Sequence, residues 1–199
     1  MKVVETIDVI CRGNVDRLSV WQKACLDVEQ AVTSIDWPHG TGIFKLNPGC
    51  KRNANGVKPI KLPGIRKLAE LGWQTERLPA KLSGVKMGNL DAVLDTEDGF
   101  VGFEWETGNI SSSHRAVNKI LLAILKGGLV GGILVVPSEA MRPYLTDRIG
   151  NITELRAYFP LWSAVRLKLG VFRVVVAEHN LLDGNVPLIP KGSDGMALR

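Results

Sequence analysis

The stretch that decides the fold is LDAVLDTEDGFVGFEWE, residues 90–106. Two runs of alternating apolar residues flank TEDG at 96–99, and Asp and Gly are typical of the tight turn between antiparallel strands. The sequence therefore predicts a β-hairpin. With a loop of the four residues Thr96 to Gly99, Asp95 pairs with Phe100, and every other pair follows by stepping away from the turn.

This register places Asp91 directly opposite Glu104, and it puts Glu106 on the same face because alternate side chains of a strand share a face. The opposite face carries apolar residues: Ala92, Leu94, Val101, Phe103 and Trp105. Spacing alone leaves a hairpin with its polar side in water as an even alternative. Like charges directly opposite each other repel, and this face is all acidic in a basic chain. The pattern therefore favours a site for a divalent ion such as Mg²⁺, which could activate water at a phosphate.

The segment TGNISSSHR follows the second strand and is rich in hydrogen-bonding groups. Gly108 permits close backbone approach, and a helix beginning near Ser112 would direct free N–H groups toward a phosphate. Asn and Arg side chains such as those of Asn109 and Arg115 suit hydrogen bonding to adenine and guanine in a major groove. The structural alternatives stay open: Ser111 or Ser112 as an N-cap, Asn109 as a turn residue and Arg115 as a solvated helix residue.

The rest of the chain alternates helix and strand in its second half, which indicates an α/β sandwich with a mixed sheet. Residues 36–64, rich in Gly, Pro and Asn, predict an extended surface segment around a short strand at 43–46. The predicted helices are 15–35, 65–72, 111–128, 138–148 and 152–158, and the further predicted strands are 73–79, 129–136 and 171–178.

Composition limits the classes of protein to consider. A chain of 199 residues, 45% of them hydrophobic, suits one domain. A net charge of +5 permits a polyanionic partner. No apolar run is long enough for a membrane span, and Glu5 and Asp8 interrupt what could have been a signal peptide. Three widely spaced cysteines without a CxxC indicate neither a disulfide framework nor a zinc site. We therefore expect a cytoplasmic protein with no membrane partner.

Several ordered segments carry a family resemblance. Asp91 followed by Glu104-x-Glu106 resembles the active-site signature of the restriction endonuclease superfamily, although Glu106 stands where most members have lysine. An acid at this position resembles the pattern of the BamHI-like type II restriction endonucleases. The same family is indicated by ETGNISSSHR (106–115), NKILLAI (118–124), YLTDR (144–148) and VPLIPKGSDGM (186–196), and by NGVKPIK (55–61) and IDWPHGTGIFKLNP (35–48) upstream.

The resemblance implies a restriction-endonuclease-like α/β fold, a central mixed sheet flanked by helices on both faces. It implies a single domain over 1–199 whose C-terminal arm, at about 185–199, contacts DNA. The implied activity is Mg²⁺-dependent cleavage of double-stranded DNA by a homodimer, at palindromic GGATCC, cut after the first G to leave a 5′ GATC overhang. Two Mg²⁺ ions per site are implied, with Mn²⁺ able to substitute. A cognate DNA methyltransferase is expected in the host, though not as a stable partner.

The resemblance also assigns roles to individual residues. The implied catalytic acids are Asp91, Glu104, Glu106 and Glu76, and the implied metal ligands are Asp91, Glu104, Glu76 and the backbone carbonyl of Phe103. Glu106 cannot stabilise phosphate charge as a lysine would, so we expect it to act as general base toward water. The implied DNA contacts are Asn109, Ser111, Arg115, Asp147 and Arg148 in the major groove, Asp194, Gly195 and Met196 in the minor groove, and Lys61 near the DNA backbone. His114 and Lys119 are implied to lie near the dimer interface.

Two other functions stay open. A repair or recombination nuclease of the same superfamily would use the same acids, but it would not need the base-contacting segments. A DNA-binding protein that has lost cleavage belongs to a different class, and the retention of all the acids opposes it.

Overall fold

The computed structural model describes residues 1–49, 52–146 and 149–191, and it is built around a mixed six-stranded sheet in the order β1-β7-β6-β5-β4-β3. The strands of this sheet are β1 (Lys2–Arg12), β3 (Gln74–Arg77), β4 (Leu90–Thr96), β5 (Gly99–Trp105), β6 (Gly131–Pro137) and β7 (Gly170–Glu178). The α-helices are α1 (Ser19–Thr33), α2 (Lys58–Glu70), α3 (Ile110–Leu125), α4 (Ile152–Arg156) and α5 (Phe159–Ser163).

The hairpin of β4 and β5 has the predicted register. Asp95 pairs with Phe100, and Ala92 pairs with Phe103. The turn is tighter than the four-residue loop of the prediction, because Thr96 also pairs with Gly99 and leaves only two residues to connect the strands. Gly99 has a φ of +130°, a backbone conformation that side chains rarely allow.

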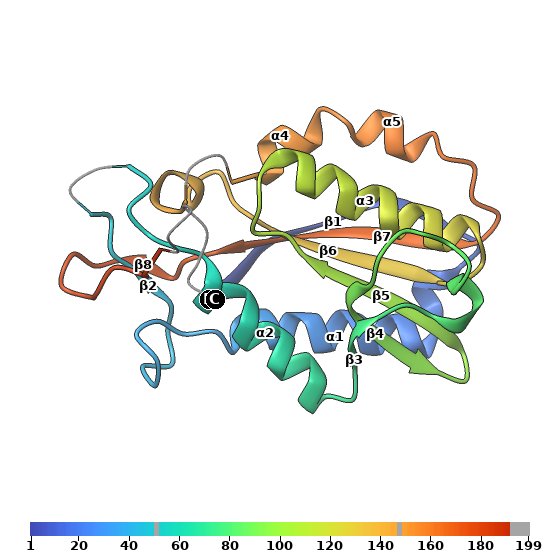
Figure 1. Ribbon diagram of the computed structural model, residues 1–199, viewed down its shortest axis with the longest axis horizontal. Coiled ribbons are helices and arrows are strands. Elements are labelled where there is room, and N and C mark those ends of the chain that lie inside the picture. Colours follow the sequence, from blue (N-terminus) through green and yellow to red (C-terminus); the bar gives the residue numbers. More distant parts are fainter. Residues whose placement is uncertain (50–51, 147–148, 192–199) are drawn as a thin grey trace.

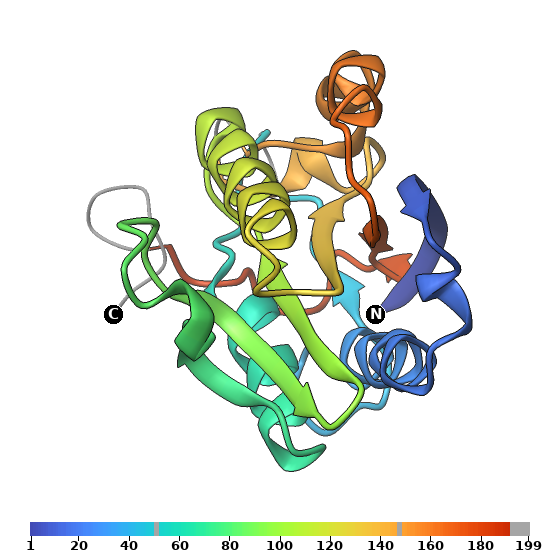
Figure 2. The ribbon, with the colours of Figure 1, turned by 90° about the vertical axis from the view of Figure 1, so that its right-hand side faces the viewer.

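Helices cover both faces of the sheet, with α1 and α2 on one side and α3, α4 and α5 on the other (Figures 1 and 2). The predicted apolar face of the hairpin, including Leu94 and Phe103, packs in the core cluster that contains the buried face of α1. Val93 packs in a second cluster with α3, α4 and α5. The layered α/β architecture with a mixed sheet is therefore confirmed, with β5, β6 and β7 parallel and the other neighbours antiparallel.

Three elements differ from the sequence-based assignment. The predicted helix 138–148 is wrong for its described part: residues 142–144 form a single 3-10 turn, and the carbonyls of Pro143 and Tyr144 accept N–H groups from Asn53 and Asn55. Helix α2 begins at residue 58 rather than 65, and it contains Pro63. Strand β1, which the sequence analysis did not assign, pairs with β7 at the edge of the sheet.

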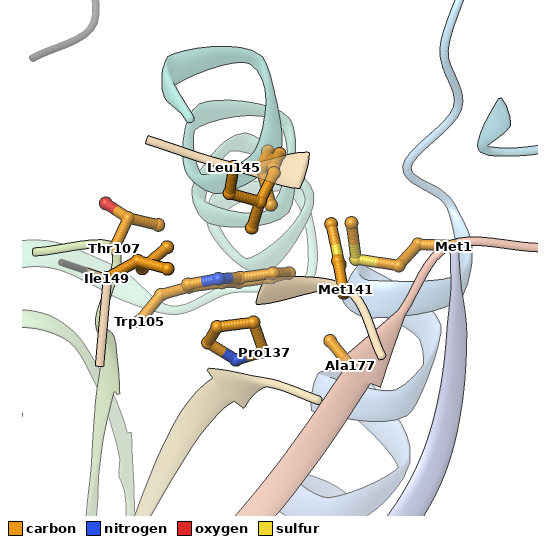
Figure 3. A pocket seen from close by; sticks show the side chains of 9 residues that line it. Met1, Trp105, Thr107, Pro137, Met141, Leu145, Ile149 and Ala177 are labelled. Atoms are coloured by element: carbon orange, nitrogen blue, oxygen red, sulfur yellow. The ribbon is translucent and has the colours of Figure 1, made fainter. Parts of the chain in front are cut away.

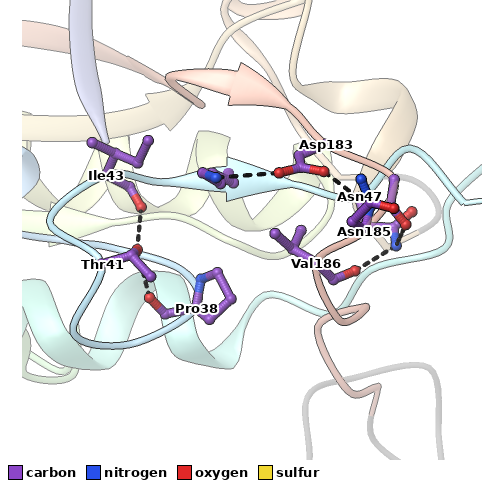
Figure 4. Close-up of polar contacts among 9 residues, drawn as sticks. Pro38, Thr41, Ile43, Asn47, Asp183, Asn185 and Val186 are labelled. Atoms are coloured by element: carbon purple, nitrogen blue, oxygen red, sulfur yellow. Dashed lines mark hydrogen bonds and ion pairs between the residues drawn. The ribbon is translucent and has the colours of Figure 1, made fainter.

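A second, two-stranded sheet joins the segment after α1 to the segment after β7. It consists of β2 (Lys45–Leu46) and β8 (Leu181–Leu182), which are parallel. Figure 4 shows the polar contacts around it: Asn47 donates from Nδ2 to the carbonyl of Val186 at 2.6 Å. The first part of the predicted C-terminal arm is therefore attached to the surface segment predicted at 36–64.

The same attachment continues toward residue 191. The backbone N–H of Gly56 donates to the carbonyl of Ile189 at 2.8 Å, and the Ile189 N–H donates to Asn55 Oδ1 at 2.9 Å. A Cβ at Gly56 would lie 2.0 Å from the carbonyl oxygen of Pro190, so this close approach of two backbones requires glycine.

Among the described helices, none is long and apolar enough to cross a membrane.

Candidate active site

Asp91 lies at the point where the pairing of β4 with β5 ends. The last pair of the ladder is Ala92 with Phe103. Beyond this pair, the backbone N–H of Trp105 donates to Asp91 Oδ2 at 2.8 Å, so the carboxylate takes the place of a backbone acceptor. The other oxygen accepts a hydrogen bond from the ammonium of Lys61 on α2, also at 2.8 Å. These contacts hold a carboxylate that is only 8% exposed.

Asp91 and Glu104 are the two residues directly beyond the last pair of the ladder, and Glu104 is 6% exposed. Its carboxylate is bonded to the ammonium of Lys119 on α3. Burial, together with the negative charge of Asp91, raises the pKa of Glu104 to about 7, although Lys119 favours the charged form. The two carboxylates therefore interact, as the sequence predicted, and each has a lysine as its partner.

Glu106 follows β5 and is half-buried. Its Oε1 accepts the backbone N–H of Gly108 at 2.6 Å. Burial raises its pKa above the usual range, whereas the Gly108 N–H and the positive charge of Lys61 oppose that shift. A carboxylate whose pKa is moved toward neutrality is suited to accept a proton at physiological pH.

The N-terminus of α3 begins directly beyond Glu106. Asn109 is the N-cap: its Oδ1 accepts the backbone N–H of Ser112 at 3.1 Å. The structure thus selects Asn109 rather than Ser111 or Ser112 as the capping residue. Asn109, Ser111 and Arg115 are all exposed at this end of the helix. An exposed helix N-terminus next to buried acids is an arrangement that suits phosphate binding.

Residues 149 and 150 join this helix end. Asn109 and Ile149 form an antiparallel bridge, and the Gly150 N–H donates to the carbonyl of Gly108 at 3.0 Å. The predicted DNA contacts Asp147 and Arg148 lie outside the described residues, as do Asp194, Gly195 and Met196.

Glu76, the predicted fourth acid, lies on β3. The register of β3 with β4, in which Thr75 pairs with Ala92, puts Glu76 alongside Asp91. Its backbone has a left-handed φ of +47°, and its side chain is exposed. The structure therefore places Glu76 next to Asp91 in the sheet, with its side chain exposed, and its role as a fourth acid stays a prediction.

The opposite face of β5 supports the acids with an apolar wall. Trp105, at 2% exposure, lines a shallow pocket between the end of β5 and residues 137–149. Figure 3 shows its ring flanked by Pro137 and Leu145, with Thr107 and Ile149 at one end of the pocket. This packing fixes the backbone that carries Glu104 and Glu106.

In the described parts of the chain, no group of three or more acidic, histidine or cysteine side chains is arranged to hold a metal ion. The donor chemistry nevertheless fits a hard divalent cation, because buried carboxylates need a cation partner and oxygen is the ligand that Mg²⁺ prefers. Lys61 and Lys119 supply that positive charge here. Sequence reasoning missed both contacts. The sequence predicts an extended segment at Lys61, which instead lies on α2, and no local pattern brings Lys119 to Glu104.

Comparison with known proteins identifies the family to which the chain belongs. The family model for the restriction endonuclease BamHI matches residues 1–196. The chain belongs to the BamHI family of restriction endonucleases. The type II restriction enzyme OkrAI of Oceanobacter kriegii is 43% identical over 173 residues, which cover 87% of this chain and 88% of that protein. The type II restriction enzyme BamHI of Bacillus amyloliquefaciens is 37% identical over 186 residues, 89% of this chain and 84% of that protein.

The fold of this BamHI-family member also occurs at much lower sequence similarity. A crystal structure of the restriction endonuclease BglII complexed with a DNA 16-mer matches with a TM-score of 0.56 at 12% identity, covering 88% of this chain and 78% of that chain. The predicted restriction-endonuclease-like fold is therefore confirmed. The two curated relatives are type II restriction enzymes, which are site-specific deoxyribonucleases, and restriction endonucleases generally use divalent metal ions.

Proposed function

We propose that this protein is a type II restriction endonuclease that cleaves double-stranded DNA at GGATCC, after the first G, with Mg²⁺ as its cofactor. The observation that carries the proposal is the pair of buried, interacting carboxylates of Asp91 and Glu104 beside the exposed N-terminus of α3. Membership of the BamHI family supports the reaction class, and the motif resemblance supports the target sequence.

Asp91, Glu104 and the backbone carbonyl of Phe103 would hold the divalent ions, with Glu76 as a further ligand. When bound, Mg²⁺ would lower the pKa of a coordinated water and stabilise negative charge on the scissile phosphate. We propose two ions per site, with Mn²⁺ able to replace Mg²⁺.

The protein's own residues would orient the reactants. Glu106 would accept a proton from the attacking water, and its raised pKa suits that role. The hydrogen bond from Gly108 to Glu106 Oε1 holds the carboxylate in place, which leaves Oε2 for the proton. The N-terminus of α3 would attract the phosphodiester backbone, and the half-buried site would limit the access of other water.

A homodimer would recognise both halves of the palindrome, because its two equivalent subunits match two equivalent half-sites. Asn109, Ser111 and Arg115 are exposed where they could enter a major groove. We assign Asp147 and Arg148 to the major groove and residues 194–196 to the minor groove. Tyr158, whose ring lies against that of His114, and Leu161 are exposed large side chains at and just before α5, and they support a self-association surface there.

Plasmid cleavage tests the proposal. Supercoiled plasmid with one GGATCC site is incubated with the protein and Mg²⁺, beside a plasmid identical except for one changed base pair in that site. We expect linear product from the first plasmid alone, and none from either plasmid with EDTA. Cleavage of both plasmids would favour a nonspecific nuclease of the superfamily, and specific binding without cleavage would favour an inactive DNA-binding protein.

A further inference from the structure

Lys119 has an unusual position for a lysine. It lies in the third turn of α3, its side chain is only 13% exposed, and its ammonium is bonded to the carboxylate of Glu104. The same ammonium donates to the backbone carbonyl of Asn89 at 2.7 Å, just before β4 begins. A long side chain is therefore immobilised between an acid on β5 and the entry to β4.

The stability of the fold alone does not explain the contact between Lys119 and Glu104. Taking an ammonium and a carboxylate out of water has a large desolvation cost, and the pair often stabilises a fold no more than apolar residues would. Leaving Glu104 buried without any cation would be worse, because an unpaired buried charge is strongly unfavourable. Lys119 therefore supplies what Glu104 needs whenever no other cation is present.

We propose that Lys119 is a positioning residue that holds Glu104 as its resident counter-ion in the metal-free enzyme and competes with the divalent ion for that carboxylate. The inference rests on the proposed function, which places an ion at Glu104. Two cations on one small carboxylate repel each other, so binding of the ion weakens the Lys119–Glu104 contact. The Asn89 carbonyl remains as a partner for the ammonium when it moves away from Glu104.

The contact of Lys61 with Asp91 differs from the contact of Lys119 with Glu104. Its side chain is 31% exposed, so water screens its charge more than that of Lys119. Asp91 also keeps a second partner, because its Oδ2 accepts the Trp105 N–H. Competition with a metal ion is therefore concentrated at Lys119.

The test is the affinity for Mn²⁺ alone, measured by electron paramagnetic resonance on the metal-free full-length protein. Lys119→Met removes the charge and keeps the length of the side chain, and Lys119→Gln keeps a hydrogen-bond donor in case the first variant folds poorly. We expect both variants to bind Mn²⁺ about tenfold more tightly than the wild type. Lys126→Met, which removes an exposed lysine at the end of the same helix, should change the affinity less than about twofold.

The outcomes separate this inference from the function on which it rests. Unchanged or weaker Mn²⁺ binding by the Lys119 variants, with a wild type that binds, would overturn the competition and leave the metal site intact. No Mn²⁺ binding by any of the proteins at millimolar concentration would remove the metal site itself, and with it this inference. In EDTA, Lys119→Met should melt below the wild type, and saturating Mn²⁺ should reduce the difference. A purely structural role would leave the difference unchanged.

Discussion

The carboxylate of Asp91, the residue just before the last backbone pair of β4 with β5, accepts the backbone N–H of Trp105 at 2.8 Å. The proposed metal ligand is thus also the group that closes the hairpin ladder. Because an asparagine in its place retains an oxygen acceptor for that N–H, charge and structure can be separated at this position.

Asp91→Asn should abolish Mg²⁺-dependent cleavage while the protein stays folded, because the substitution removes the negative charge and keeps an acceptor for Trp105. DNA binding should survive or improve, since repulsion of phosphate falls. Cleavage is measured on a plasmid and binding by gel shift in Ca²⁺. Asp95→Asn, at an exposed position of the same strand, is the matched control and should cut normally. Substantial cutting by Asp91→Asn would exclude the proposed metal site.

The stability of the metal-free protein should depend on pH through Glu104. Its pKa is raised from 4.5 to about 7 by folding, so the folded state holds the proton more tightly than the unfolded chain. Its contribution is then fully present below about pH 4.5 and is lost as pH rises through about 7. Glu104→Gln should flatten this decline, by up to about 1.4 kcal/mol per pH unit. Urea unfolding in EDTA at several pH values measures the free energy of unfolding of both proteins. Equal slopes of this free energy against pH for the wild type and Glu104→Gln would contradict the prediction.

The attachment of the C-terminal segment should depend on Gly56. Alanine there would place a Cβ 2.0 Å from the Pro190 carbonyl oxygen, so the two backbones must separate. We expect a loss of about 1–3 kcal/mol in the free energy of unfolding and faster hydrogen exchange at the Ile189 amide. Gly84→Ala is the control, because its Cβ would meet no atom within 4 Å. Unchanged exchange at Ile189 in the Gly56 variant would show that the contact is not needed.

The hairpin was predictable because its determinants are local. The turn between Thr96 and Gly99 and the alternating pattern of the flanking runs set the register of β4 and β5, and this register brings Asp91 close to Glu104. The layer of helices on each face followed from the alternation of helix and strand in the same way.

The features that were missed depend on contacts between distant segments. Strand β1 is rich in Val, Ile and Thr but is interrupted by Glu5 and Asp8, and its position in the sheet depends on pairing with β7 near the other end of the chain. The helix predicted at 138–148 does not form in its described part because the carbonyls of Pro143 and Tyr144 bind the segment at 53–55. The lysines of the acid cluster come from two helices on opposite faces of the sheet, and sequence spacing cannot bring them together.

Arg115 should contribute to sequence discrimination rather than to general affinity. It is exposed on the first turns of α3, next to the proposed site. Arg115→Ala should lose about 1–3 kcal/mol of discrimination at one base pair of the target, with little change on unrelated DNA. Arg166→Ala, at an exposed position after α5, should leave discrimination unchanged. Binding to cognate and scrambled duplexes at several salt concentrations measures both variants, and a uniform loss for Arg115→Ala would indicate a phosphate contact instead.

The central claim is that the acid cluster of Asp91, Glu104 and Glu106 cleaves DNA at one palindromic sequence. Its most direct test is to digest a fully sequenced plasmid with the protein and Mg²⁺ and to sequence the ends of every product. The account predicts ends at GGATCC alone, cut after the first G on both strands, each with a 5′ GATC overhang. Ends at an asymmetric or unrelated site, or scattered without sequence preference, would contradict it.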